Sequence, residues 1–529
     1  METPPVTPEN RFVLERRSRL SGSLLWTLQK RFYEQQGISA WSTAMIPQHI
    51  TSNPFLANAY AKLVLAFLSD CRVGEDGGDI APGEPVYIIE EGCGPGRFGY
   101  YFLKRFVELH ARSAVKDVSF RYVMTDCSAS NLKYVQAHPA LQPFVDRGEL
   151  DFGFFDAADP GEIHLLHSGG TLSPATTVNP IVVFANYILD SIPQDAFHIS
   201  AGILHECLVS ISSSDPCLTP DADDFLDRVR ISYENVRAPA DYYGEPDLDG
   251  ILEEYRVLLP GSTVCFPVAA LRNARFFGRL SRGRLLFVSS DKGYTRDEDL
   301  LDSRGLGIVI HGGAFSIGVD YNAIGRFFKN QGGRAFLPEH QHPSLAVCAF
   351  VLGPGSDGGG ATAEVYHDSF EEFGPTDVYN IVGAPGANRN IETILSLLRL
   401  SVWDASCFLA CFAELMERID DCSEALKRDL RQAVRQVWDF YYPMPGDEDV
   451  AYHLGAVLSE TGYYTEAFDL FGQSAERYGM QSTTAYNMAL CCYRLHKLEE
   501  ALSYADESLT LDASFDAARA LRIQIRSAL

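Results

Sequence analysis

The sequence predicts an α/β protein, with a doubly wound sheet that has helices on both faces and an α-helical repeat domain after it. Three observations carry this prediction. Residues 86–99 read as a buried strand, a glycine-rich turn and the start of a helix. Further short apolar segments follow, each ending in polar residues. Toward the C-terminus, small and aromatic residues recur with a period of 34.

Composition limits the classes of protein to which the chain can belong. Its 529 residues exceed one typical domain, so we expect two or three. Hydrophobic residues make up 46% of the chain, which is typical of a well-cored globular protein. The net charge of −26 argues against nucleic-acid binding, which needs a basic surface. No apolar run reaches the length of a membrane span, so we expect no membrane partner.

Cysteine usage bears on compartment and on metal binding. The 12 cysteines are scattered and form no C-x-x-C pair, which favours buried free thiols over a metal site. Free thiols fit a reducing compartment, and residues 1–10 lack the apolar core of a signal peptide. We therefore expect a cytoplasmic protein. The basic stretch at 11–31 leaves the mitochondrial matrix as the less favoured alternative.

The glycine-rich turn indicates which ligand the sheet binds. Val86 to Ile89 suit a buried strand, which the acids Glu90 and Glu91 end. The segment Gly94 to Gly99 matches the dinucleotide pattern G-x-G-x-x-G, but the neighbouring carboxylates would repel a pyrophosphate. S-adenosylmethionine has no phosphate, and it carries an ammonium and a sulfonium that carboxylates attract.

The order of an acid, any residue and three alternating glycines resembles the first motif of class I methyltransferases. We therefore predict S-adenosyl-L-methionine as the cofactor, bound by Glu90, Gly92, Gly94 and Gly96. Two alternatives stay open, namely an ordinary glycine-rich turn and an NAD-dependent oxidoreductase.

Two further strands end in acids that would complete the cofactor site. Residues 120–124 form the second strand, which leads to Asp126, and in nucleotide-binding α/β folds an acid here accepts the ribose hydroxyls. Residues 150–155 form the third strand, followed by Asp156 and Ala157, where these methyltransferases commonly contact the adenine amine. Asp126 could instead cap the following helix, and Asp156 could be a plain turn residue.

The fourth strand supplies the residues expected to face the methyl acceptor. Residues 181–185 lead into Asn186, Tyr187 and Asp190, and the carboxyl end of this strand lies beside the first, over the ligand crevice. We predict these three as catalytic residues, with Tyr187 or Asp190 removing or positioning a proton. The alternative is that Asn186 satisfies turn backbone and Asp190 is solvated.

The remaining segments give the domain organisation. Residues 1–84 are expected to form a helical lead-in or cap, including a packed helix within 11–32. Residues 85–355 form the predicted catalytic domain, with an insertion around 212–280. Within this domain we expect a hairpin at 197–211, a fifth strand at 284–289, and final strands at 315–321 and 345–352.

Residues 390–529 read as helical and contain an internal repeat. Tyr452 and Tyr486 are 34 residues apart, as are Gly455 and Ala489. This is the period of tetratricopeptide repeats, in which small residues let paired helices approach closely. Two repeats are not stable alone, so helices within 391–441 are expected to stack on them.

Four segments together resemble the MidA-like methyltransferases. This family includes the mitochondrial complex I assembly-factor enzyme, a protein-arginine methyltransferase. The segments are the glycine motif, Asn186–Pro193 for the family's Asn-Glu-x-x-Asp-Ala-x-Pro, Asp291–Tyr294 for its Asp-Tyr-Gly-Tyr, and Val319–Ile324 for its Val-Asp-Phe-x-Ala-Leu. The resemblance covers about residues 45–352 and does not extend to the C-terminal repeats, which the family usually lacks.

The resemblance implies a methyltransferase that acts on a protein or peptide, with arginine as one acceptor. Two departures weaken the case for arginine, because carboxylates hold a guanidinium bidentately. The family's Glu after Asn is Tyr187 here, and a second family Glu falls near Cys265. The alternative function is a catalytically inactive adaptor. The repeats are expected to bind a protein partner or to mediate self-association into a homodimer.

Overall fold

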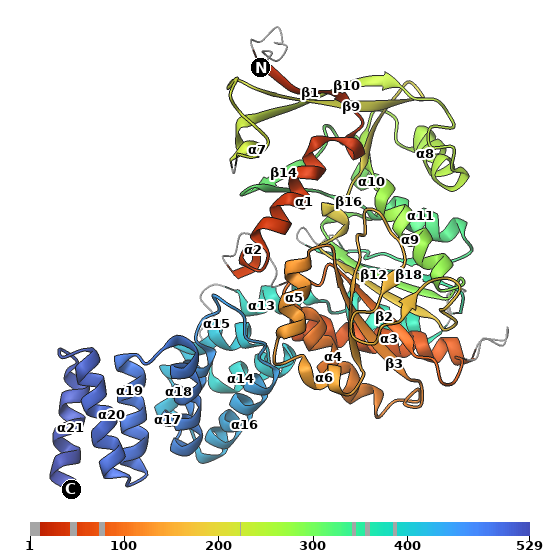
Figure 1. Cartoon of the computed structure of the whole chain (residues 1–529). Coiled ribbons are helices and arrows are strands. Elements are labelled where there is room, and N and C mark those ends of the chain that lie inside the picture. The colour runs from red at the N-terminus through yellow and green to blue at the C-terminus, as the bar shows by residue number, and fades with distance from the viewer. Residues whose placement is uncertain are drawn as a thin grey trace. The chain divides into compact units, whose positions relative to one another are not determined.

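The computed structural model describes residues 11–42, 50–73, 80–222, 224–340, 345–354, 360–384 and 389–529. The chain divides into two compact units, Met1–Thr376 and Asp377–Leu529 (Figure 1). The predicted end of the catalytic domain, at residue 355, lies outside the described residues.

The first unit is built on a seven-stranded sheet of mixed α/β type, as predicted. Its order is β17-β18-β12-β7-β2-β3-β4, and all its strands run parallel except β18, which is antiparallel to both neighbours. The near-continuous apolar stretches at these strands fit a sheet covered on both faces. The strands are β2 (Val86–Glu91), β3 (Phe120–Asp126), β4 (Leu150–Phe154), β7 (Ile181–Asn186), β12 (Leu285–Asp291), β17 (Arg334–Phe336) and β18 (Ala346–Leu352).

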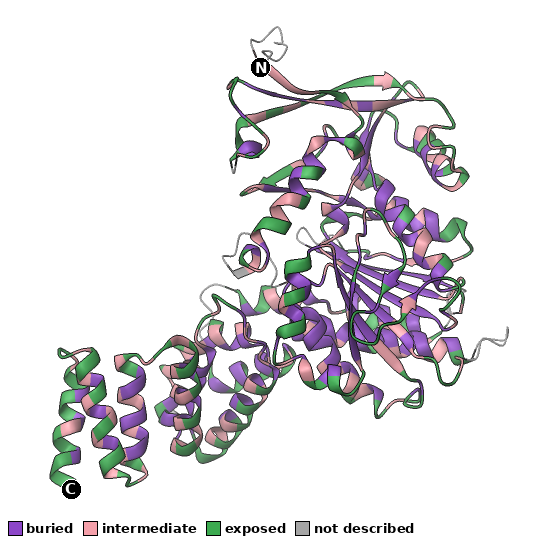
Figure 2. Ribbon diagram, viewed as in Figure 1, coloured by how far each residue is buried: buried purple, intermediate pink, exposed green. Residues whose placement is uncertain are grey.

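An aromatic layer joins one face of this sheet to its helices. Helices α3 (Pro54–Val73) and α4 (Arg97–His110) pack against each other. Phe102 of α4 lies 5.0 Å from Phe184 of β7 and 5.2 Å from Tyr122 of β3, measured between ring centroids. Figure 2 shows the strands of the sheet as almost wholly buried. Helices α5 (Ala129–Ala137) and α6 (Gln142–Asp146) connect β3 to β4.

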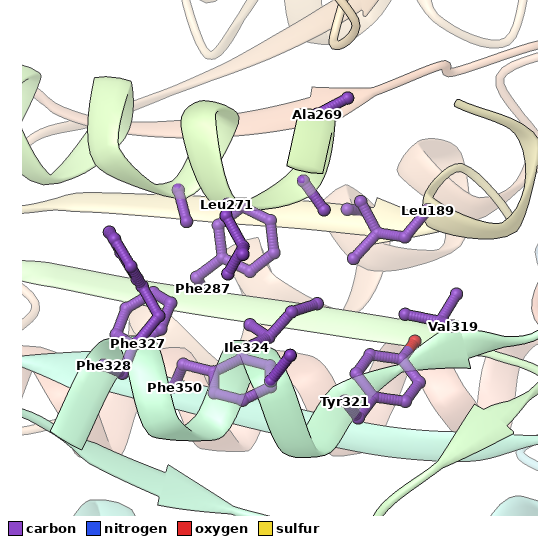
Figure 3. Packing of buried hydrophobic residues seen from close by; sticks show 14 of the residues in the cluster. Leu189, Ala269, Leu271, Phe287, Val319, Tyr321, Ile324, Phe327, Phe328 and Phe350 are labelled. Carbon is purple, nitrogen blue, oxygen red and sulfur yellow. The ribbon is translucent and has the colours of Figure 1, made fainter. Parts of the chain in front are cut away.

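The other face is covered by α9 (Val268–Leu280) and α11 (Tyr321–Asn330). Their apolar residues interdigitate with those of β12 and β18, as in the contacts of Leu271, Phe287 and Phe350 (Figure 3). The rings of Phe328 and Phe350 stack at 5.0 Å between centroids. This close packing fixes the sheet on which the site is built.

A second sheet lies in the segment between β7 and β12 and takes one strand from the N-terminus. Its order is β1-β9-β8-β11, with β10 paired to β9. The predicted hairpin at 197–211 is present as β8 and β9. The strands are β1 (Phe12–Ser18), β8 (Asp195–Ser200), β9 (Ile203–Ser213), β10 (Val229–Arg237) and β11 (Thr263–Phe266), and the adjoining helices are α7 (Phe225–Arg228), α8 (Pro246–Leu258) and α10 (Asp297–Leu300).

Three expectations about these segments are wrong. Residues 12–18 form strand β1 and not part of a helix, because they complete the second sheet beside β9. The second sheet starts with β8 at Asp195, well before the predicted insertion at 212. Residues 315–321 do not enter the main sheet; they form short pairs, and β17 takes the edge position. The short strands are β5 (Ile163–His164), β6 (Thr171–Leu172), β13 (Gly293–Tyr294), β14 (Ile308–His311), β15 (Ala314–Ile317) and β16 (Val319–Asp320).

The N-terminal helices lie between the second sheet and the cavity described below. Helix α1 (Leu24–Gln36) buries Leu25 and Trp26 in a hydrophobic core that it shares with residues of β8, β9 and β15, and α2 (Ser39–Ser42) follows it. The side chain of Gln29 donates to the carbonyl of Phe315 at 2.6 Å and accepts from its N–H at 2.9 Å. These two hydrogen bonds fix α1 against β15, whose Phe315 belongs to the same hydrophobic core as Leu25 and Trp26.

The second unit is helical, as predicted. Its helix pairs α17–α18 and α19–α20 repeat with the predicted period, and α21 follows them. A Cβ on Gly455 would lie 3.0 Å from the ring of Phe471, so close helix packing requires the small residue. The helices are α12 (Ala361–Tyr366), α13 (Pro375–Val382), α14 (Ile391–Leu400), α15 (Ala405–Met416), α16 (Glu424–Phe440), α17 (Val450–Glu460), α18 (Tyr464–Tyr478), α19 (Ser482–Arg494), α20 (Leu498–Leu511) and α21 (Asp516–Ala528), of which α12 and the start of α13 belong to the first unit. Throughout the described segments, no helix combines the length and apolarity that crossing a membrane requires.

Candidate active site

A cavity of about 600 Å³ opens at the carboxyl ends of β2, β3 and β7. Its floor is the glycine turn between β2 and α4, and its roof comes from α1 and α2. In doubly wound sheets this edge, where the crossover direction reverses, is the place of ligand binding. The cavity brings together most of the residues that the sequence singled out.

The glycine turn needs its glycines for two separate reasons. Gly92, Gly94 and Gly96 have φ of 58°, 50° and 78°, which L-residues adopt only with strain. A Cβ on Gly92 would lie 2.1 Å from Cδ1 of Ile188, and one on Gly94 would lie 3.1 Å from the ring of Trp41. The turn therefore keeps the backbone accessible between two close neighbours.

Asp126 holds this turn in shape. Its carboxylate accepts from the N–H of Gly94 at 3.0 Å and from that of Ser128 at 2.8 Å. The amide of Asn131 donates to both of its oxygens at 3.3 Å. The helix cap of α5 is Ser128 itself. Asp126 thus stabilises the glycine turn by hydrogen bonds and also lines the cavity. Its contact with ribose hydroxyls stays a prediction.

Glu90 and Glu91 both line the cavity and are both buried. The hydroxyl of Tyr122 donates to Glu90 at 2.9 Å, and the amide of Asn273 donates to Glu91 at 2.7 Å. Loss of hydration raises the pKa of each carboxyl to about 8, and these single hydrogen bonds only partly oppose the shift. Without a cation in the cavity, both groups are largely protonated at neutral pH.

Asp156 lies at the mouth of the cavity and joins it to α1. Its carboxylate accepts from the ammonium of Lys30 at 2.8 Å and from the N–H of Ala158 at 3.0 Å. Ala157, predicted with Asp156, is buried in the hydrophobic core, and Ala158 lines the cavity in its place.

Asn186 and Tyr187 lie at the cavity end of β7. The hydroxyl of Tyr60 donates to Oδ1 of Asn186 at 2.9 Å. Tyr187 has φ of 53°, a strained conformation for a residue with a Cβ, and such strain is often stored at functional sites. Burial and the nearby carboxyls of Asp291 and Asp190 raise the pKa of Tyr187 well above its ordinary value. Burial therefore favours the phenol form of Tyr187, and its role in removing or positioning a proton stays a prediction.

Asp190 does not line the cavity, and it forms a buried pair with Asp291. The backbone N–H of Asp190 donates to the Asp291 carboxylate at 3.0 Å, and Ser191 Oγ donates to Asp190 at 2.8 Å. Burial and the mutual proximity of the two carboxyls raise the pKa of Asp291 well above its usual range. Asp190 reaches the cavity only through Ser191, which does line it.

The N-terminal segment supplies site residues that the sequence did not indicate. Lys30, Tyr33 and Trp41 line the cavity from α1 and α2. The rings of Tyr33 and Trp41 lie 6.2 Å apart between centroids. No glycine or acid motif marks these residues, since they reach the site only through the packing of α1 on the second sheet.

Cys265, where the resemblance placed a second glutamate, lies in β11 of the second sheet. Its thiol donates to the carbonyl of Leu306 at 3.2 Å, and the residue does not line the cavity.

Some polar atoms of the cavity residues are buried without a hydrogen-bond partner within the described ranges, among them Oε2 of Glu91, Oδ1 of Asn131 and Nδ2 of Asn186. Unpaired buried polar atoms are costly in a folded protein and call for a ligand or ordered water. Their position in one cavity indicates a ligand with both hydrogen-bond donors and acceptors.

Comparison with known proteins gives one family match and several structural similarities. The family model of anaphase-promoting complex (cyclosome) subunit 3 matches residues 438–508. No curated protein matches the sequence. A COG1565 superfamily protein from Burkholderia thailandensis aligns at 14% identity and TM-score 0.38, over 64% of this chain and 89% of that chain. A second member from that organism, bound to S-adenosyl-homocysteine, aligns at 14% identity and TM-score 0.36, over 64% of this chain and 95% of that one.

The CMeT domain of the citrinin polyketide synthase aligns at 12% identity and TM-score 0.24, over 51% of this chain and 47% of that chain. At these TM-scores the structural similarities carry no conclusion about ligand or activity.

Proposed function

We propose that the chain is an S-adenosylmethionine-dependent methyltransferase that modifies a protein or peptide. The observation that carries the proposal is the cavity on the glycine turn, whose wall contains Glu90, Glu91 and Asp126. A bound cation favours the ionised form of Glu90 and Glu91, whereas a pyrophosphate gains no ion pair from either carboxyl. A nicotinamide dinucleotide is therefore the weaker candidate for the same turn.

The strand order supports the same assignment. In chain order the sheet reads 3-2-1-4-5-7-6 from β4 to β17, with the last strand, β18, antiparallel and inserted between the fifth and the sixth. A dinucleotide-binding sheet reads 3-2-1-4-5-6 instead. The inserted antiparallel strand is the arrangement of class I methyltransferases.

The residues in the cavity fit this donor. The unpaired Oε2 of Glu91 and Oδ1 of Asn131 can accept from its ammonium and its ribose hydroxyls. Arg97, buried at the first turn of α4, offers a cation to its carboxylate. Asp156 and Ala158 line the same cavity and are the residues that we propose contact the adenine.

The protein's part in the reaction is orientation and proton handling. S-adenosylmethionine supplies an activated methyl group when it is bound, so the chain needs no further activation of the donor. Nδ2 of Asn186 and the phenol of Tyr187 can donate hydrogen bonds that position an acceptor. The proton that leaves the acceptor can pass to Ser191 Oγ, which in turn donates its own proton to the buried Asp190–Asp291 pair through its hydrogen bond of 2.8 Å to Asp190.

The acceptor is proposed to be a side chain of a protein or peptide that the second unit helps to bind. Tetratricopeptide-like repeats suit this role because their stacked helices form an extended binding surface. Arginine remains one candidate, and the exposed Glu34, which lines the cavity, is an acid that could hold its guanidinium.

Calorimetric titration with S-adenosylmethionine and S-adenosyl-homocysteine tests the donor site. We expect the unmodified chain to bind both ligands. Glu91→Gln should lower the affinity by at least about tenfold. Glu84→Gln, which removes an exposed acid beside the same strand, should leave the affinity unchanged. Binding of NADH in place of these ligands would overturn the assignment. If both ligands bind but radiolabelled donor labels no protein in a lysate, the inactive adaptor becomes the better hypothesis.

A further inference from the structure

Strand β10 (Val229–Arg237) leaves one edge of the second sheet open. It pairs with β9 over its full length, and among the described residues no strand pairs with its other edge. Six of its nine residues are exposed. In Figure 1 it lies along the outer edge of this sheet. An unpaired edge of this length is a template for another strand.

The backbone groups that point outward can be assigned from the ladder. The N–H of Ala238 donates to the carbonyl of Leu204 at 3.0 Å, and β10 pairs with β9 in the same register. Because successive residues in an antiparallel ladder alternate between the two edges, even-numbered residues of β10 bond to β9. Val229, Ile231, Tyr233, Asn235 and Arg237 therefore present their N–H and C=O groups outward.

Strand β1, another terminal strand of this sheet, is protected against such pairing and β10 is not. Pairing of β1 with β9 is interrupted by two shifts in register, and such bulges block the addition of a strand. The register of β10 is unbroken, and the strand contains no proline. Its charges are of both signs, so they do not simply repel a second strand.

We propose that two copies of this chain associate through antiparallel pairing of their β10 strands. A second copy is the proposed partner because the charged residues Arg230 and Glu234 of β10 can pair with each other across a two-fold axis. If Ser232 lies opposite its own copy, Arg230 faces Glu234 of the partner copy twice, and Ile231 faces Tyr233 twice. Other registers are less favourable. If the two-fold axis passes through Glu234, the two glutamates lie opposite each other and repel. If it passes through Ile231 or Tyr233, no acid lies opposite Arg230.

This register also agrees with the outward backbone groups. Val229 faces Asn235 and Ile231 faces Tyr233, all of them residues with outward N–H and C=O groups, which gives about eight hydrogen bonds across the two-fold axis. Glu234 already forms an exposed ion pair with Arg17 of its own chain, and at the surface it can serve both arginines. A single strand pair buries little area, so we expect a reversible, micromolar dimer.

Disulfide trapping tests the register directly. Ser232 lies opposite itself at a non-hydrogen-bonded position, where about 4.5 Å between Cα atoms suits a disulfide. In a Cys217→Ser background, which removes an exposed native thiol, Ser232→Cys should form a covalent dimer under mild oxidation. Tyr233→Cys should not, because it lies opposite Ile231 of the partner copy and beside Val209 of its own chain, neither of which is a cysteine. Equal trapping of both variants, or of neither, would overturn the proposal.

Sedimentation velocity across a range of concentrations measures the dimer itself. Arg230→Glu should weaken it by about tenfold or more, since two attractive cross-strand pairs become repulsive. Adding Glu234→Arg should restore it, and Arg16→Glu, the same change of charge on β1, should leave it unchanged. A protein that stays monomeric at high concentration would refute the proposal.

Proline substitution separates the backbone from the side chain. Tyr233→Pro removes an outward N–H without touching the ladder to β9, so it should abolish the dimer while donor binding and thermal stability persist. Tyr233→Ala keeps the N–H and should only weaken the dimer. If Tyr233→Pro dimerises like the unmodified chain, strand pairing is excluded.

Discussion

Glu90 and Glu91 should make the affinity of the cavity for a cationic donor depend on pH. Burial raises the pKa of both carboxyls to about 8, so a cationic donor must displace a proton when it binds. We expect the affinity for S-adenosylmethionine to increase between pH 6 and 8, by up to about tenfold per pH unit for each proton released. S-adenosyl-homocysteine lacks the sulfonium and should show a smaller increase. Calorimetry in buffers of different ionisation enthalpy counts the protons, and a pH-independent affinity would contradict this view.

Glu90 and Glu91 should affect the stability of the ligand-free protein in the opposite sense, so that its stability decreases as pH rises. An acid whose pKa is raised by folding stabilises the folded state below its unfolded pKa of 4.5, and this contribution is lost as pH rises through about 8. The melting temperature of the ligand-free chain should therefore fall between pH 6 and 9. Glu90→Gln should flatten this slope, because the amide keeps a hydrogen-bond acceptor for Tyr122 but has no charge to bury. An unchanged slope would show that the titration lies elsewhere.

Gly92 is the residue at which the shape of the turn is least tolerant. Gly92→Ala places a Cβ 2.1 Å from Ile188 at φ of 58°, so we expect loss of donor binding. Gly148→Ala has the comparable φ of 71° but meets nothing within 4 Å. It should lower stability by about 1 kcal/mol and leave binding intact. Equal effects of both variants on affinity would mean that backbone strain alone, and not the contact with Ile188, explains the loss.

At the scale of elements, α1 links the second sheet to the cavity. Gln29 is 2% exposed, and both of its amide atoms bond to the backbone of Phe315. Gln29→Leu leaves that N–H and C=O unpaired, which should cost about 1–3 kcal/mol for each group and loosen the helix that carries Lys30 and Tyr33. Urea unfolding and calorimetry should show lower stability and weaker donor binding. Gln35→Leu, on the exposed side of the same helix, is the matched control and should change neither.

The elements differ in how far the sequence could predict them. Strands β2, β3, β4, β7, β12 and β18 are apolar stretches that end at polar residues or glycine, and each was predicted in place. Strand β17 has three residues, too few to show a pattern. Strand β1 reads as basic and helical because its partner, β9, lies about 190 residues away, as the pairing of Glu15 with Ile211 shows. Tertiary pairing decides such segments, and local propensity does not.

The site residues also divide into those that the local sequence predicts and those that only tertiary packing brings together. The glycine turn, Asp126 and Asn186 are local consequences of strand ends, and the structure brings them together in one cavity. Asp190 was expected in the cavity, yet the turn of Leu189–Ser191 directs it toward Asp291. Lys30 and Trp41 could not be found, since only the packing of α1 on the second sheet brings them to the glycine turn.

At the scale of the whole molecule, each unit has a core of its own. Buried residues of α19–α21, including Ala489, Cys492 and Ile525, pack together within the second unit. The main sheet is covered on both faces by helices of the first unit. Because all cavity residues belong to Met1–Thr376, the donor site is complete within that unit.

A chain that ends at Thr376 should therefore keep its donor affinity within about twofold, since no residue of the cavity is removed. If the repeats bind the acceptor, this truncated chain should lose methylation of that protein while it still binds S-adenosylmethionine. The isolated second unit, Asp377–Leu529, should then compete with the full chain for the acceptor. Calorimetry measures the first property and radiolabel transfer the other two. Full methylation by the truncated chain would move acceptor recognition to the first unit, where Tyr33, Tyr187 and Trp41 surround the cavity.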